Sequence, residues 1–450
     1  SCLYAHAVAA WGETADLKVI GEYCAVLADP REGLVRLSRS PLQAPPLVYH
    51  NDPRLAAAAS IPGPIFASGV ARQLDEACIA DRACFNFADS EATWFRDVRR
   101  VPLGSVVELC ADGGRTLRRY YDPARIAPQP KASTQAYVAR TRELLAEAVG
   151  ATLRGFARPG AALSAGLDSP QVAWHVARQL PEGQNLPTFT FHPEPGWDGI
   201  TDEGANGNER PMVEAFCAMH PRLEPHFTDN RGYGHDHRWQ DFLRIMDGCP
   251  GGLSTLYVLH GLFDAASRRG CDVLLFANWG NRTFSERGAW AFAEYFLRGR
   301  WRQLWLVLKR QGHPPHPMWR RFLSNCLVPL LPDWLWRRLR GLWHSEVSVL
   351  QEAVNPLRAS YRESSGAAQR LAATPIPLDR HLPRSRRHAI KIEFANGDAD
   401  LAEMYQALQL IYGLPCRDPT TYRPFVEFCM GLPTEMFVRD GEMRWLAKEL

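Results

Sequence analysis

The chain has 450 residues, 46% of them hydrophobic and 22% charged, and its formal net charge is +3. This length is sufficient for two domains that each bury a core, and the composition excludes a disordered or fibrous protein. The charge is too small to indicate a nucleic-acid-binding protein, and no apolar run approaches the ~18 residues of a transmembrane helix.

Residues 1–125 alternate short β-rich runs with turns that contain glycine or proline. The expected strands are at 19–27, 34–37, 47–49, 105–110 and 116–121. These runs predict a compact β-rich domain. Residues 122–131 contain three prolines and are the expected linker, so the second domain is predicted to cover 126–450.

Helix and strand patterns alternate after this linker. Ser133 is a candidate N-cap, followed by apolar residues at roughly helical spacing, Val138, Leu145, Val149 and Leu153. Strands are expected at 161–163, 188–191, 223–227 and 272–276, and helices after residue 168 and at 209–220 and 256–266. This order predicts a doubly wound parallel sheet with its ligand at the carboxyl ends of the strands, followed by a helical part beyond residue 286.

The segment 163–170 (Leu-Ser-Ala-Gly-Leu-Asp-Ser-Pro) lies between an expected strand and an expected helix. A turn of small residues before a helix N-terminus leaves backbone N–H groups for an anion, most often a phosphate. Ser164 and Ser169 offer hydroxyls, Gly166 permits close backbone approach, and Asp168 is a candidate ligand for the Mg²⁺ of a polyphosphate. An ordinary strand–turn–helix connection is the alternative, because short motifs often mislead. Residues 277–281 also follow an expected strand, so both segments are predicted to meet at one crevice.

A basic, tryptophan-rich stretch follows. Residues 300–340 contain nine Lys/Arg against one acidic residue, Asp333, and the tryptophans 301, 305, 319, 334 and 336, with Trp343 just beyond. The ordinary interpretation has the tryptophans packed inward and the cations solvated. The alternatives are a docking surface for an acidic peptide or partner protein, and a membrane-surface helix.

The loop at 163–170 resembles the pyrophosphate-binding loop, Ser-Gly-Gly-x-Asp-Ser, of enzymes that split ATP into AMP and pyrophosphate. Within that group the chain resembles the asparagine synthetase family. Partial matches occur in family order at 19–29, 37–49, 65–68, 101–104, 413–419 and 424–433. The resemblance implies an α/β protein: an N-terminal β-rich remnant of an Ntn-type amidohydrolase domain, and a C-terminal ATP-pyrophosphatase domain of the adenine nucleotide alpha hydrolase type.

Departures from the family pattern point to one branch. Asn281 and Arg282 stand where the synthetases have an Asp-Glu pair, and the Gly-Asn-x-Thr-x-Ser form at 280–285 resembles lasso-peptide cyclases. The Arg-Asp-Pro-Thr run at 417–420 is similar to that branch as well. Pro415 stands where relatives have a catalytic glutamate, so no general base is assigned.

The resemblance implies a site for ATP and Mg²⁺. The expected ATP- and pyrophosphate-binding residues are Leu163, Ser164, Gly166, Asp168, Ser169, Phe191, Asn278 and Gly280, with Leu163 and Phe191 beside the adenine. Asp168 and Asn281 are the expected metal ligands and catalytic residues. Relatives also carry an Asp-Glu pair near the nucleotide after the second strand, where this chain has Asp202, Glu203 and Glu209; for Glu209, helix capping is an equal alternative.

Three functions are compatible with these residues. A lasso-peptide cyclase adenylates a side-chain carboxylate of a precursor peptide and closes it onto the peptide's own N-terminal amine, with the precursor and its maturation protease as partners. A glutamine-hydrolysing asparagine synthase is the second, although Asn281 and Arg282 and a Cys2 that follows Ser1 weigh against it. The third is a non-catalytic homologue that binds nucleotide or peptide.

The remaining signals concern location and metals. Eleven cysteines without Cys-x-x-Cys spacing, most in apolar runs, predict reduced thiols in a cytoplasmic protein, and no signal peptide is recognisable. His235 and His237 flank Asp236, but a His-x-His run without further ligands is more typical of a polar loop than of a zinc site.

Overall fold

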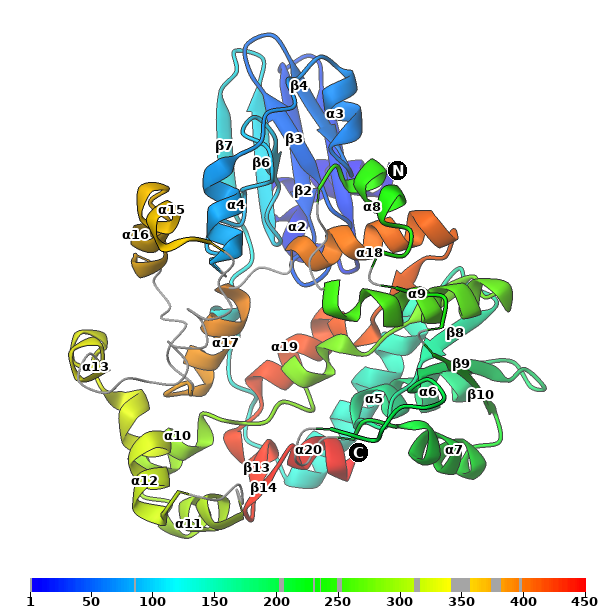
Figure 1. Cartoon of the computed structure of the whole chain (residues 1–450), viewed down its shortest axis with the longest axis vertical. Helices are drawn as coiled ribbons and strands as arrows, with labels where there is room; N and C mark the ends of the chain where they lie inside the picture. The colour runs from blue at the N-terminus through cyan, green and yellow to red at the C-terminus, as the bar shows by residue number, and fades with distance from the viewer. Residues whose placement is uncertain are drawn as a thin grey trace.

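The computed structural model describes residues 2–84, 86–201, 206–229, 231–234, 236–248, 253–310, 316–340, 357–373, 382–395 and 399–450. Within them, every helix is too short or too polar to traverse a lipid bilayer. The fold is mixed α/β, with the N-terminal part at the top of Figure 1 and a parallel sheet covered by helices below it.

The N-terminal part is built on antiparallel sheets. Its elements are α1 (Cys2–Trp11), η1 (Gly12–Thr14), α2 (Ala15–Lys18), β1 (Cys24–Asp29), β2 (Leu34–Arg39), β3 (Val48–Asn51), β4 (Ala56–Ala59), α3 (Gly63–Ala67), α4 (Glu76–Ala83), β5 (Arg99–Arg100), β6 (Ser105–Cys110) and β7 (Arg115–Arg119). A four-stranded sheet has the order β1-β2-β6-β7 and a three-stranded sheet the order β4-β3-β5. Leu37, Tyr49 and Val107 share one core, so side chains of both sheets pack together.

The five expected N-terminal strands are present, but the first is shorter than predicted. It begins at Cys24 instead of residue 19, because 15–18 form α2 and 19–23 are irregular. The helices α1, α3 and α4 were not predicted. Their apolar residues are alanine-rich and do not form a long amphipathic stripe, so helical periodicity is weak in the sequence.

A five-stranded parallel sheet forms the centre of the second part, in the order β10-β9-β8-β11-β12. Its strands and helices are η2 (Pro123–Arg125), α5 (Thr134–Thr152), β8 (Pro159–Ala162), α6 (Asp168–Gln179), β9 (Leu186–Phe191), α7 (Arg210–Met219), β10 (Leu223–Thr228), α8 (Trp239–Met246), α9 (Leu253–Arg268), β11 (Val273–Leu275) and η3 (Asn278–Arg282). Ser133 caps α5 as predicted, since its hydroxyl accepts the Ala136 N–H at 3.1 Å.

The sheet is doubly wound, as the alternating pattern predicted. One apolar core lies between the sheet and α5, α6 and α19 (Arg423–Gly431), and a second contains residues of α9 and α18 (Ala399–Tyr412). The chain progresses from β8 to β9 and β10 in one direction and then returns to place β11 on the other side of β8. The crevice at this reversal, between the ends of β8 and β11, is the position where such sheets bind ligands.

The last third of the chain is mostly helical. Its elements are α10 (Ala291–Leu297), α11 (Trp301–Arg310), α12 (Met318–Phe322), η4 (Leu323–Leu327), η5 (Val328–Leu330), α13 (Asp333–Arg340), α15 (Ala359–Ser364), α16 (Ala367–Ala372), α17 (Arg386–Ala395), α18, β12 (Cys416–Arg417), η6 (Pro419–Thr421), α19, η7 (Thr434–Met436), β13 (Val438–Arg439), β14 (Glu442–Met443) and α20 (Trp445–Glu449). The expectation of helix alone beyond residue 286 is wrong for β12, which adds a parallel strand beside β11, and for the β13–β14 hairpin. Strands of two residues are too short to show a period of two in the sequence.

Two sequence expectations on side chains are decided by burial. Nine cysteines from Cys24 to Cys429 are free thiols, as predicted. The interpretation that the tryptophans pack inward is wrong for Trp301, Trp305, Trp319 and Trp334, which are exposed. Trp343 lies outside the described residues.

Candidate functional site

The loop after β8 and the segment after β11 meet at the reversal of the sheet. Asp168 is the first residue of α6, and Gly280 is buried in η3. The two are so close that a Cβ atom on Gly280 would lie 2.4 Å from the Asp168 Cγ. Two segments that the sequence analysis selected separately therefore form one site, and only glycine at position 280 leaves room for the aspartate.

The loop's backbone N–H groups are already bonded to oxygen atoms. The Ser164 N–H donates to the Ser169 hydroxyl at 2.8 Å, and the Gly166 N–H donates to the Ser164 hydroxyl at 3.2 Å. The Ala165 N–H donates to the Glu209 carboxylate, 3.3 Å away. These donors converge on oxygen acceptors beside a helix N-terminus, an arrangement that also suits the oxygens of a phosphate.

Glu209 belongs to this site, which its place in the sequence left open. It lies immediately before α7, yet its carboxylate forms no capping bond there and instead reaches the loop. Asp202 and Glu203, the other acidic residues expected near the nucleotide, lie outside the described residues.

The Asp168 side chain fits a cation ligand. Its Oδ1 is buried and has no hydrogen-bond partner among the described residues. Burial raises the pKa of Asp168 above its ordinary value, while the Ser285 hydroxyl and the Arg444 charge lower it. A buried acceptor oxygen without a donor requires an explanation, and a bound metal ion is one that a carboxylate supports. Asn281, the other expected ligand, follows Gly280 directly and its side chain is exposed.

Three residues that were predicted to contact the nucleotide lie in different surroundings. The Leu163 side chain is only 3% exposed and packs in the core, so it is not available as a surface for adenine. Phe191 ends β9, half-buried, with its ring 5.6 Å from that of Tyr257. The Asn278 amide donates to the Tyr405 hydroxyl at 2.8 Å, so it is engaged with α18 instead of the loop.

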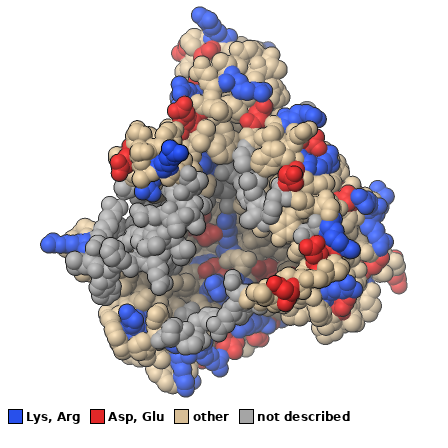
Figure 2. All heavy atoms as spheres, viewed as in Figure 1, with Lys and Arg blue, Asp and Glu red and all other residues tan. Residues whose placement is uncertain are grey.

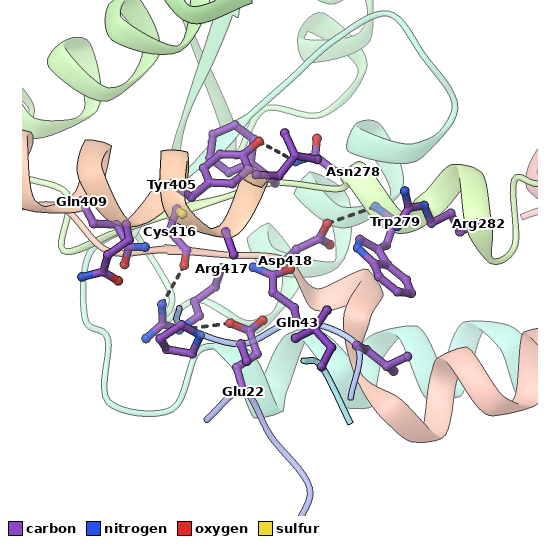
Figure 3. Close-up of a pocket in the computed structure, with 18 residues that line it drawn as sticks. Glu22, Gln43, Asn278, Trp279, Arg282, Tyr405, Gln409, Cys416, Arg417 and Asp418 are labelled. Atoms are coloured by element: carbon purple, nitrogen blue, oxygen red, sulfur yellow. Dashed lines mark hydrogen bonds and ion pairs between the residues drawn. The ribbon is translucent and has the colours of Figure 1, made fainter. Parts of the chain in front are cut away.

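A cavity of about 450 Å³ adjoins the segment after β11 (Figure 3). Both parts of the chain line it. Residues of the N-terminal part are Glu22, Leu42, Gln43, Ala44, Pro45 and Leu103. Those of the second part are Phe276, Asn278, Trp279, Arg282, Leu401, Ala402, Tyr405, Gln406, Gln409, Cys416, Arg417 and Asp418. The walls are therefore mainly apolar, with four carboxamides among the polar groups.

Burial raises the pKa of two carboxyl groups that line this cavity, Glu22 and Asp418. Burial raises the pKa of Glu22 to about 7, although the Arg417 charge opposes the change; the Arg417 Nε lies 3.8 Å from a Glu22 oxygen. Burial raises the pKa of Asp418 to about 6 against the hydrogen bonds that it accepts. Those bonds come from the Thr420 hydroxyl, from the Trp279 N–H at 3.1 Å and from the Thr420 N–H at 2.8 Å, so Asp418 ties β12 to η3.

The N-terminal wall of the cavity is held by a buried cation. Arg39 is 2% exposed, and its guanidinium donates to the carbonyls of Ala44, Pro45 and Val101 at 2.8 to 3.2 Å. Sequence reasoning missed this residue and also Glu22, Gln43 and the glutamines of α18. None of them belongs to a recognisable motif, and they come together only through the contact between the two parts of the chain.

Pro415 and His235 are the remaining residues that the sequence singled out. Pro415 lies at the amino end of β12, where its carbonyl accepts the Leu274 N–H at 2.8 Å. His235 lies outside the described residues, and within them no group of three or more metal-ligating side chains is gathered.

Comparison with protein-family models gives a match over more than half of the chain. The family model described as asparagine synthase matches residues 140–450, which include both loops and most of the cavity. No curated protein matches the chain. Among solved structures, the U34-tRNA thiolase NcsA from Methanococcus maripaludis is 14% identical, with 64% of this chain and 84% of that chain covered and a TM-score of 0.25, too low to carry an argument.

Proposed function

The chain belongs to the asparagine synthase family, and from this premise we propose that it is an ATP-dependent ligase that joins a carboxylate to an amine with release of AMP and pyrophosphate. The contact between Asp168 and Gly280 carries the proposal, because it joins the anion-binding loop to the segment after β11 at the sheet's reversal. The family uses ATP, and the loop is where its phosphates would bind.

The chemistry requires that charge be stabilised on the leaving pyrophosphate. A carboxylate is a poor acyl donor, and attack by its oxygen on the α-phosphorus of ATP makes an acyl adenylate. In this proposal the N–H groups of 164–166 exchange their bonds within the protein for bonds to the departing phosphates, and the Ser164 and Ser169 hydroxyls and the N-terminus of α6 add to the binding. Mg²⁺ would be held by Asp168 and Asn281 and would neutralise phosphate charge. The amine then attacks the acyl carbonyl, an amide forms and AMP leaves.

We propose that the acyl substrate is a peptide, as in a lasso-peptide macrolactam cyclase. Three features of the cavity support this choice over free aspartate. It is roomy, its walls are mainly apolar, and its carboxamides, Gln43, Asn278, Gln406 and Gln409, suit the N–H and C=O groups of a peptide backbone. Its two cations, Arg417 and Arg282, already face Glu22 and Glu393, so they are poor partners for a free amino acid's carboxylate.

The proposal also assigns a role to each of the two domains. We propose that 1–125 is a domain descended from an Ntn-type amidohydrolase and that 126–450 is the synthetase domain. In the proposed enzyme the first domain supplies the Glu22 and 42–45 wall of the substrate cavity. The proposed partners are a precursor peptide and its maturation protease in the cytoplasm, without nucleic acid.

ATP–pyrophosphate exchange tests the proposal, because exchange requires a reversible adenylation. The full chain is assayed with ATP and Mg²⁺ and with either a peptide that bears an acidic side chain or free aspartate. Exchange that depends on the peptide supports the cyclase. Exchange driven by aspartate favours the glutamine-hydrolysing asparagine synthase, and ATP binding without exchange on either substrate favours a non-catalytic homologue.

A further inference from the structure

Helix α11 exposes two tryptophans at the margin of its buried face. Leu304, Val307 and Leu308 point into the core, whereas Trp301 is 59% exposed and Trp305 is 53% exposed. One exposed aromatic residue is ordinary on a protein surface, but two on adjacent turns of one helix are not explained by packing of the fold.

The neighbouring helices extend this surface. The Trp301 ring rests edge-on against Phe296 of α10 at 5.6 Å, which fixes the start of α11. Helix α12 contacts α11 and carries Trp319, which is 62% exposed. Trp334 of α13 is exposed as well. We call Trp301, Trp305, Trp319 and the cations beside them, Arg302, Lys309 and Arg320, the tryptophan face.

Cations accompany the indoles directly. The Lys309 ammonium lies 4.9 Å from the Trp305 ring centre, and the Arg320 guanidinium lies 6.0 Å from that of Trp319. Arg302 is exposed next to Trp301. Figure 2 shows blue Lys and Arg side chains among mainly tan residues at the lower left, where Figure 1 places α11 and α12. Positive charge and amphipathic aromatic rings thus coincide on one part of the surface.

We propose that the tryptophan face docks the protein onto a membrane that contains anionic lipid. Indole rings partition to the headgroup region, where an apolar ring meets a polar medium, and Lys and Arg add attraction to acidic headgroups. A helix whose tryptophans border its buried face and whose cations Arg302 and Lys309 lie further round on its exposed side is suited to lie along such a surface.

An acidic peptide would match the charge but not the shape. Peptides are held in grooves, in aromatic-lined slots or along open sheet edges. The three cavities described in this structure are lined by other residues, and the tryptophans project from two separate helices. A flat lipid surface requires no groove, so it accounts for the arrangement with fewer assumptions.

Cosedimentation of the full chain with vesicles tests the proposal. Vesicles of phosphatidylcholine alone are compared with vesicles in which about one third of the lipid is phosphatidylglycerol. We expect binding to the anionic vesicles that weakens at high salt and falls at least ~10-fold in the double variant Trp301→Gln/Trp305→Gln. Absence of binding to anionic vesicles, or undiminished binding of this variant, overturns the proposal.

The chain offers a matched control. Trp11 of α1 is 44% exposed and has Lys18 5.1 Å from its ring, so it is the same kind of pair at another place. The variant Trp11→Gln/Lys18→Gln is expected to bind vesicles like the wild type, and a loss equal to that of the α11 variant overturns the assignment to the tryptophan face.

A second variant, which changes charges instead of tryptophans, tests the proposal even if Trp301→Gln/Trp305→Gln does not fold. In Arg302→Gln/Lys309→Gln both indoles stay, and we expect the preference for anionic over neutral vesicles to decrease. An acidic peptide such as polyglutamate serves as the competing ligand. Retention of the protein on immobilised polyglutamate without any binding to anionic vesicles overturns the membrane proposal in favour of a protein partner.

Discussion

Replacement of Gly280 by alanine tests the geometry on which the candidate site rests. The new Cβ would lie 2.4 Å from the Asp168 Cγ and 2.6 Å from its Cβ and Oδ1, whereas ordinary contacts begin near 3.4 Å. Asp168 or η3 must therefore move by about 1 Å. The backbone at Gly280 does not have a positive φ, so the effect comes from this contact and not from backbone strain.

The expected consequences differ for stability and activity. Overpacking of this kind costs about 1–3 kcal/mol of unfolding free energy. A displacement of about 1 Å in a group that positions reacting atoms costs roughly 100-fold in rate. We therefore expect Gly280→Ala to remain folded, as measured by circular dichroism and urea unfolding, while its ATP–pyrophosphate exchange rate falls about 100-fold.

Gly261→Ala on α9 is the matched control. Its Cβ would meet the Thr228 hydroxyl at 3.3 Å and no atom closer, and alanine favours a helix interior over glycine by about 1 kcal/mol. This variant is expected to keep full exchange activity and to lose no stability. A Gly280→Ala protein that exchanges pyrophosphate like the wild type, with an unchanged KM for ATP, would refute the assignment of Asp168 and Gly280 to one site.

Further predictions concern single side chains. Asp168→Ala removes the buried carboxylate and is expected to abolish exchange while nucleotide binding without Mg²⁺, followed by calorimetry, changes little; full activity would show that Asp168 is not the metal ligand. Glu22 holds its proton more tightly in the folded chain than in the unfolded chain, with a pKa raised from 4.5 to about 7, so its ionisation costs stability as the pH rises through this window. Glu22→Gln removes that cost. The unfolding free energy of this variant minus that of the wild type should therefore increase by up to about 3 kcal/mol between pH 5 and pH 8. A difference that does not vary with pH contradicts the raised pKa. Arg39→Met leaves three carbonyls unpaired in the N-terminal wall and is expected to lower the unfolding free energy by about 3 kcal/mol in urea titrations, whereas a loss below about 0.5 kcal/mol would mean that these bonds contribute little.

The sequence alone determined the features that depend on short stretches of chain. Alternation of apolar runs with helical patterns was enough to predict β8, β9, β10 and β11 in one parallel sheet, because each element must bury its own apolar side. The small residues of 163–170 were found because a backbone that binds phosphate needs little side-chain bulk, and 277–281 were found because they follow another expected strand. Their position at the carboxyl ends of two strands of one predicted parallel sheet implied a shared crevice.

Tertiary structure alone decided what depends on residues far apart in the chain. Glu22 faces Arg417 and Arg39 supports the wall at 44–45 only because the two parts of the chain pack together, and no local spacing encodes that contact. The tertiary structure also buries the Leu163 side chain, which is therefore not a surface for adenine. It leaves Trp301 and Trp305 of α11 exposed, because neighbouring elements cover only some of the apolar residues of that helix. Periodicity identifies which residues share a face, but the partner across that face is set by the whole fold.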